Sequence, residues 1–274
     1  MGESVYTLKT ARERTEKNRL DELHMALREY MSNQPSFAPQ IYSAMPRRIL
    51  ELGCGSGAWA IDAASDFPDT EVVAVDLSPT LEGVPLPKNI NFQIVDATQP
   101  FRFDQKSFDV VHSRFVLMHL PNVKDVMERA AQLVKPGGWV VFEDMNNRRV
   151  IETATPVVSR VMNLWAGIAE ARGADAHIGK KMEAIVRDTG LFSEIHAKKI
   201  VMPLCNRSSA SPAMMRLAAA FRATMQRVAV DWSQRFSAEG ISKEVAEQFD
   251  IELDADSPEV QHEIYFVWAR RTVE

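Results

Sequence analysis

Residues 50–57 read Leu-Glu-Leu-Gly-Cys-Gly-Ser-Gly and directly follow the apolar residue Ile49. This stretch predicts a strand that runs into a glycine turn, with a helix beginning near Gly57. Gly53, Gly55 and Gly57 can adopt backbone angles closed to other residues, so the main chain can approach a ligand closely. Because a helix N-terminus presents free N–H groups and the positive end of its dipole, we expect an anionic or carboxylate-bearing cofactor above the turn.

The next two predicted strands each end in an aspartate. Val72–Val75 is followed by Asp76, and Phe92–Val95 is followed by Asp96 and Ala97. A carboxylate at the end of a second strand can accept hydrogen bonds from both hydroxyls of a ribose, in nicotinamide and flavin enzymes as in other classes. Asp96 could accept from an adenine amino group while the N–H of Ala97 donates to the ring. The G-x-G-x-G spacing of the turn differs from the G-x-G-x-x-G fingerprint of dinucleotide-binding proteins.

Alternating strands and helices continue to about residue 145. A fourth strand is predicted at 108–112, a helix that ends at Gly137-Gly138 follows, and a fifth strand is predicted at 139–143. This alternation is typical of the α/β class with a doubly wound parallel sheet. Ligands of such sheets bind outside the carboxyl ends of the strands, where the glycine turn, both aspartates and residues 112–115 are expected, so the sequence predicts one pocket there.

The ordered motifs ELGCGSG, VVAVDLS, IVDATQP, FDVVHSRFVLMHLPN and LVKPGGWVVFED together cover about residues 47–145. They resemble the Rossmann-like class I S-adenosylmethionine-dependent methyltransferases. RLDELH (19–24) and AWAIDAASDFPDTEVVAVDLSP (58–79) are similar to the fungal secondary-metabolism methyltransferases related to LaeA, and more distantly to ubiquinone and menaquinone methyltransferases. The resemblance implies S-adenosyl-L-methionine as cofactor, S-adenosyl-L-homocysteine as product, and a seven-stranded sheet whose last strand runs antiparallel between the fifth and sixth.

The resemblance also implies two divisions of the chain: an N-terminal helical lid at 1–46 and a methyltransferase domain at 47–274. A helical insertion at about 204–258 is expected before the last strand, and with the N-terminal helices it would roof the active site. The periodicity within these regions predicts helices at 7–31, 152–172, 181–189 and 212–250, and strands at 192–203 and 262–270.

Further cofactor contacts follow from the resemblance. Glu51 lies beside the turn, where related enzymes often keep an acid near the amino group of the cofactor. Leu77, after Asp76, joins the predicted cofactor site. Arg114 and Phe115, just past the fourth strand, could contact the methionine end, although a surface salt bridge explains Arg114 equally well.

Plain structural roles remain open for several of these residues. Asp76 could cap the following turn through Ser78-Pro79, and Asp96 could be an ordinary turn aspartate. His112, at a strand end, is interpreted as a packing residue or as one near the cofactor.

Methyl transfer from a sulfonium is an in-line displacement, so the protein must align the reactants and exclude water. A phenol or carboxylic acid can ionise unaided, whereas an alcohol or amine benefits from a general base. His119 is the candidate base, with a structural role in its loop as the alternative. Trp165 and Met214 are candidate substrate contacts among residues that otherwise form the core, and Tyr6 is a candidate lid residue on the family outline alone. No metal is predicted.

The composition excludes some partners. The 274 residues carry a net charge of −5 and are 46% hydrophobic, which argues against nucleic acid or an anionic membrane as a partner. The basic residues between Arg12 and Arg19 alternate with Glu13 and Glu16, which suggests a solvated helix face. No apolar run is long enough to span a membrane and the N-terminus is too polar for a secretory signal, so we expect a cytoplasmic protein. A homodimer through an exchanged N-terminal helix is possible.

The sequence thus favours a methyltransferase that acts on a small hydrophobic natural product such as a polyketide or terpenoid. O-methylation of a phenol, carboxylic acid or hydroxyl is the leading hypothesis. A LaeA-like regulatory protein that retains the cofactor fold, and a cofactor-binding enzyme of non-methylating chemistry, remain alternatives. A protein-substrate methyltransferase is a further one.

Overall fold

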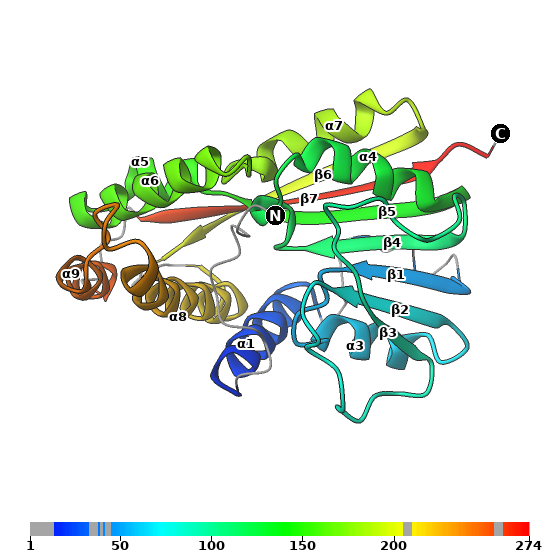
Figure 1. The fold of residues 1–274 in the computed structure, drawn as a ribbon, viewed down its shortest axis with the longest axis horizontal. Helices are drawn as coiled ribbons and strands as arrows, with labels where there is room; N and C mark the ends of the chain where they lie inside the picture. The colour runs from blue at the N-terminus through cyan, green and yellow to red at the C-terminus, as the bar shows by residue number, and fades with distance from the viewer. Residues whose placement is uncertain are drawn as a thin grey trace.

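The computed structural model of the chain describes residues 14–32, 38, 41, 45–204, 210–254 and 260–273. Its centre is a seven-stranded sheet in the order β3-β2-β1-β4-β5-β7-β6 (Figure 1). The strands are β1 (Arg48–Leu52), β2 (Glu71–Asp76), β3 (Ile90–Ile94), β4 (Phe108–Arg114), β5 (Val134–Asn146), β6 (Phe192–Pro203) and β7 (Gln261–Arg271). The α-helices are α1 (Arg14–Tyr30), α3 (Ala58–Asp66), α4 (Val123–Leu133), α5 (Arg148–Thr153), α6 (Pro156–Ala171), α7 (Met182–Asp188), α8 (Pro212–Arg235) and α9 (Lys243–Asp254), with 3₁₀ turns η1 (Leu117–His119) and η2 (Ile178–Lys181).

The strand order confirms the predicted doubly wound sheet. Strands β1 to β5 are parallel to one another, and β7 runs antiparallel to both β5 and β6. Phe266 of β7 therefore lies between Glu143 of β5 and Lys198 of β6 in the register. The predicted position of the last strand, antiparallel between the fifth and sixth, is confirmed.

The central strands are apolar on both faces, as strands covered by helices on both sides must be. In β2, Val72 and Ala74 pack on one side with α3, while Val73 and Val75 join the larger core on the other. The same alternation occurs in β1, β4 and β5, where the side chains of α4 and α6 contribute to the larger core. Two hydrophobic layers thus hold the parallel strands with their carboxyl ends at one edge.

The remaining helices gather beyond that edge. Figure 1 shows α5, α6, α8 and α9 past the ends of β4 and β5, with α1 between them and α3. Helix α1 packs against both α8 and α3. The predicted helical insertion before the last strand is confirmed as α8 and α9, and the predicted N-terminal helix appears as α1. Within the described residues, no helix combines the length and the apolar character needed to cross a membrane.

The predicted end of the helix before the fifth strand was wrong. Helix α4 ends at Leu133 rather than at Gly137-Gly138, because the chain is already extended at Val134, which pairs with Phe108. A Cβ atom at Gly138 would lie 2.7 Å from the backbone oxygen of Asp109, so this glycine permits close strand contact instead of capping a helix.

The basic stretch of α1 is not simply a solvated face. Glu16 is buried and accepts hydrogen bonds from Arg19 Nε and Nη2 at 2.8 and 2.6 Å. The Arg19 guanidinium also approaches Thr224 of α8, with 3.4 Å between Nη1 and Oγ1. Packing of α8 over this pair removes it from solvent, which the charge pattern alone does not reveal.

Candidate functional site

The glycine turn after β1 is a tight main-chain cradle. Gly53, Gly55 and Gly57 have φ angles of 72°, 53° and 79°, in the left-handed region that favours glycine. The N–H groups of Gly53 and Cys54 both donate to the backbone oxygen of Val75, at 2.8 and 2.9 Å. These hydrogen bonds fix the turn to the end of β2. Helix α3 begins directly after the turn, so its N-terminus lies next to it.

Asp76 fastens the turn from the neighbouring strand. Its Oδ2 accepts from the Gly55 N–H at 2.9 Å, and its Oδ1 accepts from the Ser78 N–H at 3.0 Å. Burial raises the pKa of this carboxyl. The turn-capping role that the sequence left open is therefore present, and ribose binding by Asp76 stays a prediction. Leu77 beside it is 54% exposed, an apolar side chain open at the rim.

Asp96 and Ala97 lie just past β3, at the same edge. Asp96 Oδ1 accepts from both the N–H and the hydroxyl of Thr98, at 2.9 and 2.6 Å, as a turn aspartate does. The backbone oxygen of Ala97 accepts from Arg129 at 3.0 Å. These contacts fix the loop and leave the predicted adenine contacts untested.

Glu51 has the most unusual environment of the predicted cofactor residues. It is 4% exposed, and its Oε2 has no hydrogen-bond partner within the described residues. Burial raises the pKa of Glu51 to about 8. A buried carboxyl oxygen without a partner is costly, and a bound ammonium group would satisfy it. The turn, Asp76 and Glu51 together thus fit a cofactor that carries a ribose and a charged amino group.

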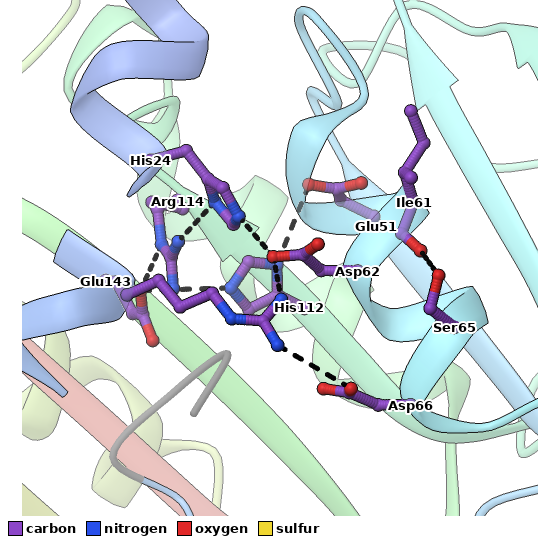
Figure 2. A network of polar contacts seen from close by, with 10 residues as sticks. His24, Glu51, Ile61, Asp62, Ser65, Asp66, His112, Arg114 and Glu143 are labelled. Atoms are coloured by element: carbon purple, nitrogen blue, oxygen red, sulfur yellow. Dashed lines mark hydrogen bonds and ion pairs between the residues drawn. The ribbon is translucent and has the colours of Figure 1, made fainter. Parts of the chain in front are cut away.

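Arg114 forms a buried ion pair with Glu143 (Figure 2). Its Nε contacts Glu143 Oε2, and its Nη1 lies 3.2 Å from Nδ1 of His24 on α1. Although burial favours the neutral acid, the charge of Arg114 lowers the pKa of Glu143 to about 2. The salt bridge that the sequence left open for Arg114 is therefore present, but it is buried rather than on the surface, and a contact with the methionine end of the cofactor remains a prediction.

The same network extends from α1 to α3 (Figure 2). His24 Nε2 lies 2.7 Å from Asp62 Oδ2, and Arg28 pairs with Asp62 and reaches Asp66 at 3.7 Å. Burial lowers the pKa of His24, while the hydrogen bonds from His24 and Arg28 hold the pKa of Asp62 below its usual value despite burial. Helix α1 is therefore tied by charges to the helix that begins at the glycine turn.

Aromatic side chains form the other side of the site. Phe115, with a left-handed φ of 55°, meets Phe221 of α8 edge to face at 5.6 Å between ring centroids. His119 lies 6.2 Å from Trp165 of α6, which stacks on Trp232 of α8 at 5.1 Å. The structure therefore brings the predicted base and one predicted substrate residue together.

A buried carboxyl group fixes the loop that carries His119. Asp144 Oδ2 accepts from the Met118 N–H at 3.2 Å, and burial raises the pKa of this carboxyl to about 7. Burial, followed by the charge of Arg19, lowers the pKa of His119 to about 4. Its imidazole is consequently neutral near pH 7, the form able to accept a proton, but a pKa this low also makes it a weak base.

The predicted substrate residues differ in their surroundings. Trp165 is 2% exposed, so its indole belongs to the packed core. Met214 is half-buried in the first turn of α8, where its N–H donates to the Ser211 side chain at 3.3 Å. Tyr6 lies outside the described residues. Within the described residues, no group of three or more His, Cys, Asp or Glu side chains could hold a metal ion.

Sequence reasoning missed the polar network. His24 and Arg28 are one helical turn apart, as are Asp62 and Asp66. The two basic residues of one helix and the two acidic residues of the other have the same four-residue spacing, and this could have indicated that the two helices face each other. Glu143 could also have been noted, as an acid that ends a buried strand.

A family model described as "Methyltransferase domain" matches residues 15–192. The chain is 32% identical to methyltransferase str2 of Strobilurus tenacellus over 253 residues, which cover 92% of this chain and 90% of that protein. It is 39% identical to str3 of the same organism over 210 residues, 76% of this chain and 74% of that protein. The secondary metabolism regulator laeA of Monascus pilosus is 34% identical over 172 residues, which cover 60% of this chain and 46% of the regulator.

Among solved structures, the fold is similar to that of Haemonchus contortus phosphoethanolamine N-methyltransferase 2, described in complex with phosphomonomethylethanolamine and S-adenosylhomocysteine. The TM-score is 0.51 at 19% identity, and the match covers 82% of this chain and 49% of that one. At this identity the likeness concerns the fold alone.

Proposed function

The chain belongs to the methyltransferase domain family of class I S-adenosylmethionine-dependent enzymes, and on that premise we propose that it methylates an oxygen of a small hydrophobic natural product. The observation that carries the proposal is the combination of the glycine cradle, Asp76 and the unpartnered Glu51 oxygen at one sheet edge. The similarity to str2, str3 and laeA supports a place in fungal secondary metabolism.

S-adenosylmethionine supplies an electrophilic methyl group on a sulfonium. In our proposal Asp76 binds the ribose and Glu51 the amino group, while Asp96 and the Ala97 N–H bind the adenine. Leu77, exposed at the rim, would cover one face of that ring. Each role uses a group that already lies at the carboxyl edge of the sheet.

The acceptor would lie on the aromatic side of the site. The partly buried Phe115 and the buried Phe221 make the region next to the end of β4 apolar, which favours a hydrophobic acceptor and keeps water from the reacting atoms. His119 is neutral near pH 7 and would accept the proton of a hydroxyl acceptor. A phenol or carboxylic acid would not need it. The N-terminal segment, including Tyr6, would act as a lid, and no partner beyond the small molecule is required.

The first test is calorimetric binding of S-adenosylmethionine and S-adenosylhomocysteine to the wild type and to Asp76→Ala. We expect micromolar binding that weakens about 100-fold in the variant, which corresponds to ~2.7 kcal/mol. Asp69→Ala is the matched control, because Asp69 is exposed and precedes β2 at the opposite edge of the sheet. Absence of binding to the wild type would refute the enzyme function.

A second test separates methyl transfer from the alternatives. Phenols, carboxylic acids and alcohols are incubated with labelled cofactor, and the products of wild type and His119→Ala are compared across pH. Loss of turnover for alcohols but not phenols would support His119 as the base, and full turnover in the variant at every pH would exclude it. Cofactor binding without transfer to any acceptor would favour a laeA-like regulatory protein or a non-methylating enzyme.

A further inference from the structure

His112 is a buried histidine placed between two carboxylates. Its Nδ1 lies 4.0 Å from Glu51 Oε1, and its Nε2 lies 3.9 Å from Glu143 Oε2. Neither ring nitrogen has a hydrogen-bond partner within the described residues. The indole of Trp59 stacks on the imidazole with 3.7 Å between centroids and 7° between planes. The stacking fixes the ring plane, so each nitrogen stays directed at one carboxylate (Figure 2).

The charges around this histidine define which nitrogen carries the proton. Burial lowers the pKa of His112 to about 4, so near pH 7 the ring is neutral and has a single N–H. Glu143 is ionised and paired with Arg114, and is therefore the stronger acceptor. We assign the proton to Nε2, facing Glu143, which leaves the Nδ1 lone pair facing Glu51.

Glu51 Oε1 consequently faces an acceptor nitrogen, 4.0 Å away, rather than a cation. Its own raised pKa of about 8 keeps it protonated near pH 7, so its O–H can donate to Nδ1 after a small approach. Arg114, Asp76 and Glu143 also act on Glu51 through their charges, the backbone N–H of Ala60 donates to its carboxyl group, and the charge of His24 on α1 acts on His112. With Oε1 held in this way, Oε2 is the oxygen left for a ligand.

We propose that His112 is a positioning residue that orients the Glu51 carboxyl, through Nδ1, toward the amino group of the cofactor's methionine portion. The inference rests on the proposed function, in which Glu51 binds that amino group. It assigns to His112 a role in ligand binding that acts only through Glu51 and concerns only the amino-acid end of the cofactor.

A packing role would have the opposite energetic signature. At the observed 4.0 and 3.9 Å from the two carboxylates, the ring nitrogens of the ligand-free protein gain no hydrogen bond, and a phenylalanine could stack on Trp59 without burying a polar atom. His112→Phe should therefore be at least as stable as the wild type, and any loss that it shows should be a loss of ligand binding.

The test compares two ligands that share the adenosine moiety. S-adenosylhomocysteine carries the amino-acid chain, and 5′-methylthioadenosine lacks it. Calorimetry on His112→Phe should show affinity for the first reduced about tenfold or more and affinity for the second changed less than about twofold. His112→Asn places a polar atom near the Nδ1 position and should recover most of the affinity.

A double-mutant cycle identifies Glu51 as the mediator. Glu51→Ala should lower S-adenosylhomocysteine affinity selectively, and His112→Phe combined with it should cause no further loss. Thermal denaturation of every variant checks folding.

Three outcomes would overturn the inference. His112→Phe could weaken both ligands equally and lower the melting temperature, which would show a structural role. It could leave both affinities unchanged, which would show no role. If the wild type bound neither ligand, the proposed function itself would fail, an outcome distinct from normal binding by the variant.

Discussion

The cofactor side and the aromatic side of the site are built from different kinds of sequence. Around the glycine turn, the contacts involve main-chain atoms and single carboxylates at the ends of adjacent strands, β1 and β2. On the aromatic side, the residues come from the loop after β4 and from α6 and α8, and they meet only through tertiary packing: Phe115, Trp165, Phe221 and Trp232. Contacts of the first kind can be predicted from a short motif, whereas contacts of the second kind depend on how helices distant in the sequence pack together.

The largest expected effect tests whether the aromatic side is independent of the cofactor side. Trp165→Ala removes a buried indole that packs against Trp232 and should lower the free energy of unfolding by about 3–5 kcal/mol. S-adenosylhomocysteine affinity, measured at low temperature where the variant is folded, should change little. Urea denaturation and calorimetry measure the two quantities, with Trp165→Phe as the milder control. A folded Trp165→Ala that no longer bound would contradict the division.

The reciprocal experiment disturbs the cofactor side alone. Gly53→Ala forces alanine into a φ of 72° and places its Cβ against Val116, so the cradle must shift. We expect S-adenosylhomocysteine affinity to fall about 30-fold, or ~2 kcal/mol, by calorimetry. Gly83→Ala is the matched control, because Gly83 has a similar φ of 75° but an added Cβ would meet no atom within 4 Å. Equal losses in both variants would mean that backbone strain, not the cradle, was being measured.

The buried acids and the buried histidines of the site should respond oppositely to pH. The pKa of Glu51 is about 8 in the folded protein, above its unfolded value, so its contribution to stability is lost as pH rises toward 8. His119, and the buried His262 of β7 whose ring lies 5.8 Å from that of Phe221, have folded pKa values of about 4, below their unfolded value, so their contribution is lost as pH falls from about 6.5 toward 4.

Denaturation of the ligand-free protein across pH measures both slopes. Glu51→Gln should remove about 1 kcal/mol per pH unit of the decline between pH 6.5 and 8, and His262→Asn a similar part of the decline below 6.5. Unchanged slopes in these variants would assign the pH dependence to other groups.

The smallest expected effect concerns the link between the sides through α1. Arg28→Ala removes the ion pairs with Asp62 and Asp66, which are partly exposed, and should cost about 0.5–1 kcal/mol of stability. Affinity for S-adenosylhomocysteine should fall two- to threefold, on the order of 0.5 kcal/mol. Arg187→Ala, which removes an exposed pair with Glu183 on α7, is the control. A much larger affinity loss would show that α1 belongs to the cofactor side.

The features that could be predicted from the sequence divide in the same way, between short motifs and contacts made by tertiary packing. Asp76 closes β2 as predicted because a β-branched run that stops at an acid marks a strand end, and the predicted bounds of β6 agree with the structure. The network around His112 was not predicted because it depends on strand register. Glu51 lies opposite His112, and Arg114 lies opposite Glu143, pairings that no local pattern specifies.

Glu16 and Arg19 show the same limit for helices. Their spacing predicts an ion pair on α1, but burial of that pair depends on α8, about 200 residues later. For His112, the sequence left open a packing role and a role near the cofactor, since a position at a strand end is compatible with both.

The position of β7 has a consequence for how the molecule is made. The ribosome delivers β1 to β5 and then β6, α8 and α9 before it delivers β7, yet β6 joins the sheet only through β7. Until β7 is synthesised, β6 therefore has no partner strand in the sheet. During the same period the apolar side chains of α8 and α9 lie next to an unpaired edge of β5. Such an intermediate is prone to aggregate, so the nascent chain has a period in which chaperones would protect it. The cofactor half can form early, whereas the acceptor half is completed only when the last strand arrives.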